Sequence, residues 1–189
     1  NCGSEDVEMI WLHDGVEEKG VTVYCETEED VKNAPGKERI SIISLKDLEP
    51  CWSLPRAKEP EFLRWSVNWI GGTTGFQNLN PGRAVESEKI AVGLTVLMPG
   101  HKQVPVTHRE VSETYIIIGG KTVVDLGEGN IEVGYLDGLY FPPGLTHSLR
   151  NHGTKPAYIV WAHSKANPIG GTVYEGQSPV HRIGNSPSC

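Results

Sequence analysis

The sequence predicts an all-β domain, because short apolar runs recur along the chain with turn-forming residues between them. Of the 189 residues, 22 are glycine and 13 are proline, which is a higher content of turn-forming residues than is usual in a helical protein. Each apolar run has the length of a strand rather than of a helix. Short strands at such regular spacing are typical of a β-sandwich or a β-barrel.

The strongest strand signals lie in the second half of the chain. Residues 90–98 form a run that Pro99-Gly100 ends, and residues 113–118 form another that ends at Gly119-Gly120. Residues 121–126 follow directly, and we expect them to be the hairpin partner of the strand before them. Further strands are expected at residues 131–135, 139–141, 146–150 and 157–163.

The first half of the chain is less regular. We expect an aromatic-rich strand at residues 62–70, after a proline-rich loop over residues 48–60. Weaker signals are strands at residues 21–24 and 40–45 and a short helical turn at residues 28–32.

Three segments follow from this pattern. We expect an N-terminal extension that packs on the barrel, the barrel itself, and a Gly/Pro/Ser-rich tail that wraps the surface or frays. Their bounds are residues 1–39, 40–166 and 167–189.

Composition excludes several classes of function. A net charge of -7 argues against a nucleic-acid partner, which would need clustered Lys and Arg. No apolar run approaches the roughly 18 residues of a membrane span, and no signal peptide is visible. The four cysteines form no C-x-x-C pair, which excludes a zinc ribbon. We interpret them as free thiols of a cytoplasmic protein, with a disulfide as the alternative.

Two segments carry candidate chemistry. In the first, strand alternation places Val106 and His108 on one face, and Glu113 and Tyr115 on one face. In the second, Pro142-Pro143-Gly144 enforces a turn that sets the direction of the following strand and hence of His147. Imidazole and carboxylate together suit zinc, iron, manganese or nickel.

These segments resemble the two motifs of the cupin superfamily, over about residues 88–165. Gly100, His108, Glu113 and Gly120 fall at places of the first motif, G-x5-H-x-H-x3,4-E-x6-G. The second motif, P-x-G-x-x-H-x-x-x-N, is matched in full by Pro142, Gly144, His147 and Asn151. The resemblance implies a cupin jelly-roll β-barrel with an N-terminal extension. It also implies a homodimer, and the strand at residues 62–70, with Trp65 and Trp69 on one face, is the candidate interface.

One departure from the family pattern affects the expected metal site. Cupins usually bind metal through three His and one Glu, and the first of those histidines is Val106 here. The resemblance leaves His108, Glu113 and His147 as ligands of one divalent ion. Two His and one carboxylate also make up the facial triad of non-haem iron oxygenases, which favours Fe(II) over Zn, Mn or Ni.

Other polar and aromatic residues are candidates for the same pocket. Tyr115 and His163 are candidate acid/base groups, and Trp161 shares a face with His163. The alternative for these residues, and for Tyr140, is core packing. His101, Gln103 or His163 is a candidate fourth ligand.

The sequence thus predicts a metal-dependent enzyme that acts on a small oxygenated organic substrate. A non-haem iron dioxygenase is the first hypothesis. The second is a lyase, cyclase or isomerase that uses the metal as a Lewis acid while a Tyr or His moves the proton. A ligand-binding or storage cupin without catalytic activity is the third.

Overall fold

The computed structural model describes residues 3–13, 27–33, 41–72, 78–127, 129–166 and 172–175. The chain divides into two compact units, Asn1–Ser41 and Ile42–Cys189. In the first unit, α1 (Glu28–Asn33) forms where the helical turn was expected. Thr27 and Asp30 cap its start, since each side chain accepts a hydrogen bond from the backbone N–H of the other. The strand expected at residues 21–24 lies outside the described residues.

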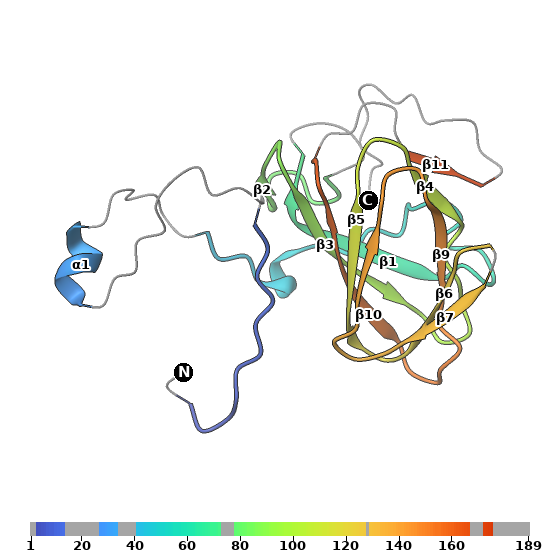
Figure 1. The fold of residues 1–189 in the computed structure, drawn as a ribbon, viewed down its shortest axis with the longest axis horizontal. Coiled ribbons are helices and arrows are strands. Elements are labelled where there is room, and N and C mark those ends of the chain that lie inside the picture. Colours follow the sequence, from blue (N-terminus) through green and yellow to red (C-terminus); the bar gives the residue numbers. More distant parts are fainter. Residues whose placement is uncertain are drawn as a thin grey trace. The chain divides into compact units, whose positions relative to one another are not determined.

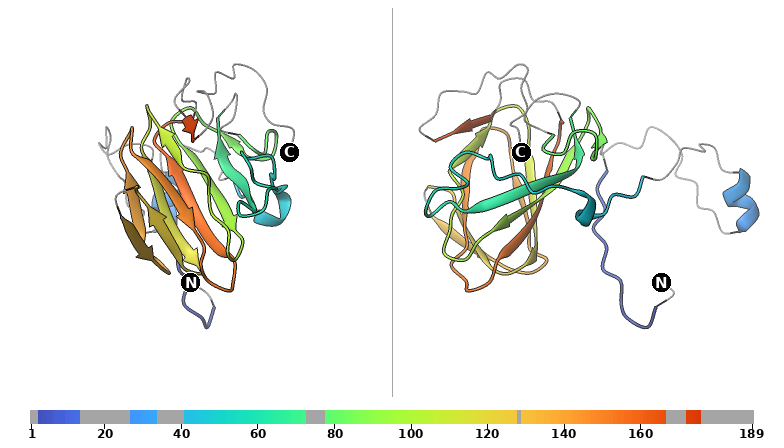
Figure 2. Two further views of the ribbon diagram at one scale, coloured as in Figure 1. Left: turned by 90° about the vertical axis from the view of Figure 1, so that its right-hand side faces the viewer. Right: turned by 180° about the vertical axis from the view of Figure 1, so that it is seen from behind.

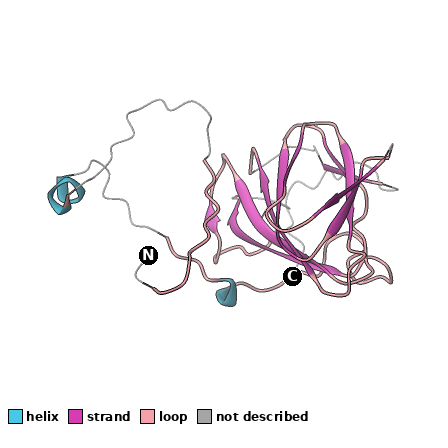
Figure 3. Ribbon diagram, turned by 60° about the horizontal axis from the view of Figure 1, so that its bottom comes forward, coloured by secondary structure: helices cyan, strands magenta, loops and turns pink. Residues whose placement is uncertain are grey.

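The second unit contains two sheets that face one another (Figures 1 and 2). The first sheet has six strands, in the order β2 (Val85–Glu86), β1 (Arg64–Gly71), β3 (Ala91–Leu97), β10 (Ala157–His163), β5 (Glu113–Gly119), β8 (Gly138–Phe141). The second has five, in the order β11 (Thr172–Tyr174), β4 (Val106–His108), β9 (Thr146–Arg150), β6 (Thr122–Asp125), β7 (Asn130–Val133). Apart from the parallel β1–β2 pair, these strand pairs are antiparallel. The predicted all-β jelly roll is confirmed (Figure 3).

Alternation along β5 and β10 fills the space between the sheets. Their register pairs Ile117 with Ile159, Tyr115 with Trp161, and Glu113 with His163. The inward side chains therefore change from aliphatic to aromatic to ionisable along the strand pair. The apolar end belongs to the main core, whose other members include Leu97, Val124, Phe141 and Leu149.

The prediction that residues 113–118 and 121–126 pair as a hairpin is wrong. β5 pairs with β10 and β8, whereas β6 pairs with β7 and β9 in the opposite sheet. The chain changes sheets at Gly120, which has φ of +75°. A Cβ on Gly120 would lie 2.8 Å from the carbonyl oxygen of Pro156, so a side chain is excluded there both sterically and conformationally.

Three further expectations differ from the structure. The described part of the run at residues 40–45 forms no strand; Leu45–Asp47 is a 3-10 turn and Ile42 is exposed. Within the segment expected to be a tail, β11 adds to the second sheet and buries Tyr174. Cys51 is disulfide-bonded, which contradicts the interpretation of the cysteines as free thiols. The other three cysteines lie outside the described residues.

The outer face of β1 carries Trp65 and Trp69, which are half-buried against a second apolar cluster. A homodimer formed through this face stays a prediction. Among the described residues, no helix has the length and apolar character needed to cross a membrane.

Replacing Gly120 with Ala tests the change of sheet. We expect the free energy of unfolding to fall by more than the roughly 1–2 kcal/mol of a left-handed non-glycine residue, because the Cβ also meets Pro156 and Ala157. Gly127→Ala is the matched control, since Gly127 has φ of +83° but open space around its Cβ position. Urea unfolding measures both variants; equal losses would contradict a steric role for Gly120.

Candidate metal centre

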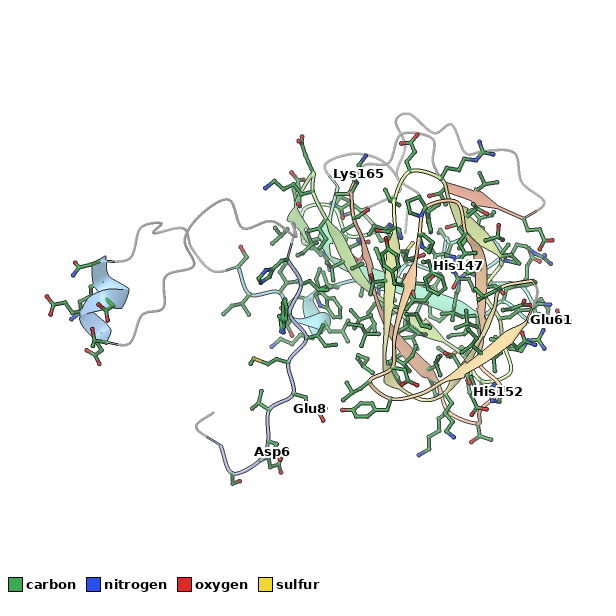
Figure 4. The ribbon with its side chains drawn as sticks, viewed as in Figure 1. Asp6, Glu8, Glu61, His147, His152 and Lys165 are labelled. Atoms are coloured by element: carbon green, nitrogen blue, oxygen red, sulfur yellow. The ribbon has the colours of Figure 1, made fainter. Side chains whose placement is uncertain are left out.

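Four strands from both sheets bring three imidazoles to one carboxylate. His108 on β4 and His147 on β9 place Nε2 at 3.1 and 3.0 Å from Glu113 Oε2. His163 on β10 places Nε2 at 3.0 Å from the other oxygen, Oε1. All four side chains are buried, and Figure 4 shows His147 within the barrel, in contrast to His152 at its periphery.

The predicted ligand triplet is compact. The ligand atoms of His108, Glu113 and His147 all lie within 4.8 Å of one another. His163 Nε2 faces Oε1, the other carboxylate oxygen, and its ring centroid is 4.5 Å from that of His108. The structure therefore brings together the three predicted ligands and both predicted acid/base groups, His163 and Tyr115.

The second motif positions His147 through its turn. Gly144 has φ of +86°, and its N–H donates to the carbonyl of His108 at 2.7 Å, which ties the turn to β4. The strand that follows pairs His147 with Val106. Asn151, at the end of the motif, donates its side-chain amide to the carbonyls of Leu97 and Lys155 and has a structural role.

Contacts at Nδ1 help to hold two of the three rings with Nε2 toward the carboxylate. His147 Nδ1 lies 3.2 Å from the carbonyl of Leu145, which only accepts, so Nδ1 carries the proton of the neutral ring. Its Nε2 lone pair then faces Glu113 Oε2. Thr172 Oγ1 lies 2.9 Å from His108 Nδ1 and bonds to it as donor or acceptor, according to the tautomer of the ring. Lone pairs that face a carboxylate at this distance need a positive charge between them, from a proton or a metal ion.

The charge of Glu113 suits a ligand. Burial alone would raise the pKa of this carboxyl. Without a metal ion, the positive charges of protonated His163 and His108, with hydrogen bonds from protonated His108 and His147, outweigh burial and hold the pKa of Glu113 well below its usual range. Glu113 is therefore a carboxylate, with its two oxygens directed at imidazoles.

Tyr115 lies beside the cluster. Its hydroxyl is 3.3 Å from His147 Nε2 and accepts a hydrogen bond from Gln103 at 3.4 Å. Burial, reinforced by the negative charge of Glu113, raises the pKa of Tyr115 well above its usual value, so the phenol keeps its proton. Phe141 stacks on the His147 ring at 3.9 Å and fixes its plane.

A cavity of about 70 Å³ opens onto the cluster. It is lined by Glu113, Tyr115, Trp161 and His163, as expected, and Gln103 also lines it. His101 is not among the lining residues, and Tyr140 is 66% exposed. The suggestions that His101 supplies a ligand and that Tyr140 lines the pocket therefore find no support.

Sequence reasoning missed several residues of this cavity, among them Arg64, Thr172 and Tyr174. Arg64 had a detectable signal, because it alternates with Ser66 and Asn68 on one face of an aromatic-rich strand. Thr172 and Tyr174 had none, since β11 forms only by pairing with β4, more than 60 residues earlier in the sequence.

The family comparison agrees with this geometry. Residues 93–163 match the family model of a cupin domain, and this range contains all four side chains of the cluster. No curated protein matches the chain closely enough to count as a relative.

Solved cupin structures resemble this chain. A sugar phosphate isomerase of the cupin superfamily from Silicibacter pomeroyi has a TM-score of 0.56 at 20% identity, covering 72% of this chain and 83% of that one. The polyketide cyclase RemF from Streptomyces resistomycificus also has a TM-score of 0.56, at 12% identity, covering 74% and 88%. An oxalate oxidase in complex with glycolate has 0.50 at 18%, covering 85% and 75%. At these identities the likeness shows the cupin fold alone.

Thr172→Val tests whether the Thr172 hydroxyl orients His108. Without the Nδ1 partner, the affinity for a divalent ion should fall by roughly 10–100-fold. Thr107→Val is the matched control, because the Thr107 hydroxyl bonds to the hydroxyl of the exposed Thr146. Isothermal titration with Co²⁺ measures both variants; equal affinities would show that Thr172 does not support the ring.

Proposed function

We propose that this cupin is a metal-dependent enzyme that acts on a small oxygenated organic substrate. The observation that carries the proposal is the buried Glu113 carboxylate among three inward-facing imidazoles, at the edge of a cavity. Three nitrogen donors and one carboxylate are a donor set that first-row divalent ions favour.

The ligands we propose are His108, Glu113 and His147, with His163 as the fourth. Val106 is buried opposite His147 and offers no donor atom. His163 reaches the cluster from β10 because its strand register pairs it directly with Glu113. This position supports a role for His163 as the imidazole that replaces the absent family histidine, rather than as a free acid/base group.

We favour Fe(II) as the ion, with Zn, Mn and Ni as alternatives. A six-coordinate iron with four protein ligands would keep two positions for substrate and dioxygen, whereas a redox-inert ion would polarise a substrate oxygen. The residues of the chain then hold and orient the substrate. Trp161 and Ile159 supply an apolar wall that limits water, and Gln103 and Tyr115 offer hydrogen bonds.

The second candidate is a lyase, cyclase or isomerase, and Tyr115 favours it. Its phenol keeps its proton beside the proposed ligand His147, which suits a group that protonates a developing carbanion or enolate on the substrate. A non-catalytic ligand-binding cupin is the third candidate, and purified protein that binds no metal would favour it.

Alanine substitutions test the ligand set. His147→Ala, His108→Ala and Glu113→Ala should each reduce metal affinity by more than the roughly 10–100-fold that loss of a supporting hydrogen bond produces. His152→Ala is the control, because His152 is exposed. Elemental analysis after reconstitution gives the metal content. Full metal content in all three variants would place the site elsewhere.

Val106→His tests the role of His163. His163→Ala should lower metal affinity, and the double variant Val106→His/His163→Ala should recover most of it by restoring the usual family ligand. If His163 is an acid/base group instead, His163→Ala should retain its metal and Val106→His should add nothing to activity. Titration with a competing chelator measures affinity independently of turnover.

Oxygen dependence separates the two enzyme hypotheses. For the dioxygenase, the Fe(II)-loaded protein should convert small keto, hydroxy and enolic acids in air and not under argon. It should also bind nitric oxide, seen by electron paramagnetic resonance, and His147→Ala should lose that signal. Equal turnover under air and argon, or activity with Zn²⁺, would contradict the dioxygenase and support the Lewis-acid alternative.

A further inference from the structure

Arg64 places a buried positive charge on the wall of the same cavity. It is the first residue of β1, it is 2% exposed, and it lines the cavity with Glu113, His108 and His163. A guanidinium stays charged in a protein, and a buried charge is strongly destabilising unless an opposite charge pairs with it.

Neutral groups account for the hydrogen bonds of Arg64 within the described part of the chain. Nη1 donates to the carbonyl of Phe62 at 3.3 Å, and Nη2 to that of Pro55 at 2.9 Å. These bonds use two of the five N–H groups. Among the described residues, no carboxylate forms an ion pair with Arg64, and Glu113 is already surrounded by imidazoles.

Tyr174 lies within electrostatic range of both charged groups of the cavity. Burial raises the pKa of Tyr174 to about 12; the positive charge of Arg64 opposes this rise and the negative charge of Glu113 adds to it. Burial lowers the pKa of Arg64, and Tyr174 and Tyr115 oppose that shift. The cavity is thus lined by the Arg64 guanidinium, by residues of the imidazole–carboxylate cluster, and by the protonated phenol of Tyr174, which interacts electrostatically with both charged groups.

We propose that the substrate is a small carboxylic acid whose carboxylate pairs with Arg64 while a second oxygen reaches the His108–Glu113–His147–His163 cluster. This inference rests on the proposed function and names its substrate class. The planar fork of a guanidinium matches a carboxylate. A single arginine in the lining suits one negative charge, and a cavity of about 70 Å³ has room for only a few non-hydrogen atoms.

A purely structural role is the competing explanation for Arg64. Both carbonyls that it binds belong to the loop before β1, so Arg64 also holds that loop in place. If this is its only role, substitution lowers stability and leaves ligand preference unchanged. Ligand charge preference, rather than stability, is therefore the readout.

Binding of matched acids and amides tests the proposal. Isothermal titration of Co²⁺-loaded protein would compare glycolate and pyruvate with glycolamide and pyruvamide, and with methyl phosphate. We expect each acid to bind at least ~10-fold more tightly than its amide, since a hydrogen-bonded charge pair contributes that much. Arg64→Met should abolish the preference. Arg64→Lys should retain part of it, because the charge remains without the fork.

Arg150→Met is the matched control. Arg150 is an exposed arginine on β9 that does not line the cavity, and its removal should leave the preference intact. If Arg64→Met does not fold, as judged by circular dichroism, the wild-type preference and Arg64→Lys decide the question.

Several outcomes would overturn the inference. One is that neither acid binds at about 50 mM, a concentration roughly 10⁴–10⁵ times that needed by a micromolar ligand. The others are equal binding of acid and amide, a preference that survives Arg64→Met, and tighter binding of methyl phosphate. The same titrations on metal-free protein separate this inference from the proposed function. If the protein takes up no metal but still prefers acids in an Arg64-dependent way, the proposed metal-dependent function is wrong. The inference that the ligand is a carboxylic acid would still be supported. Metal uptake without an acid preference would overturn the ligand class alone.

Discussion

The burial of the Glu113 carboxylate is the constraint on which the rest of the site depends. A carboxylate away from water needs compensating positive charge and hydrogen bonds, and here three imidazole Nε2 atoms lie 3.0–3.1 Å from its oxygens. Those imidazoles come from β4, β9 and β10, so both sheets must close around the same point. A divalent ion is a stronger source of that charge than protons shared among histidines, because each His Nε2 can then bind as a neutral ligand.

β5 and β10 each contribute to the apolar core at one end and to the ionisable cluster at the other. β5 and β10 contribute Ile117 and Ile159 to the apolar core and Glu113 and His163 to the cluster, with Tyr115 and Trp161 between them. The packed end fixes the strand register, and the register in turn fixes which ionisable side chains meet. Rigid strands, rather than loops, therefore set the geometry of the four proposed ligands.

The local motifs were enough to predict the fold and the compact triplet. Pro142, Gly144 and His147 act within one turn and one strand, so their geometry is readable from spacing. The role proposed for His163 depends on its pairing with Glu113, 50 residues earlier in the sequence, and could be inferred only from the strand register. Local reasoning also failed at Gly120, where adjacent strands suggested a hairpin although the chain crosses to the other sheet. Arg64 was missed because a strand arginine usually points to solvent.

X-ray absorption spectroscopy of the Co²⁺-loaded protein tests the proposed donor set most directly, since it reports the atoms around the ion without requiring a substrate. We expect three imidazole nitrogens and at least one carboxylate oxygen at about 2.0–2.2 Å, with the multiple-scattering signature of imidazole rings. A first shell made up of water and carboxylate oxygens, without imidazole scattering, would contradict a metal site built on Glu113 and its histidines.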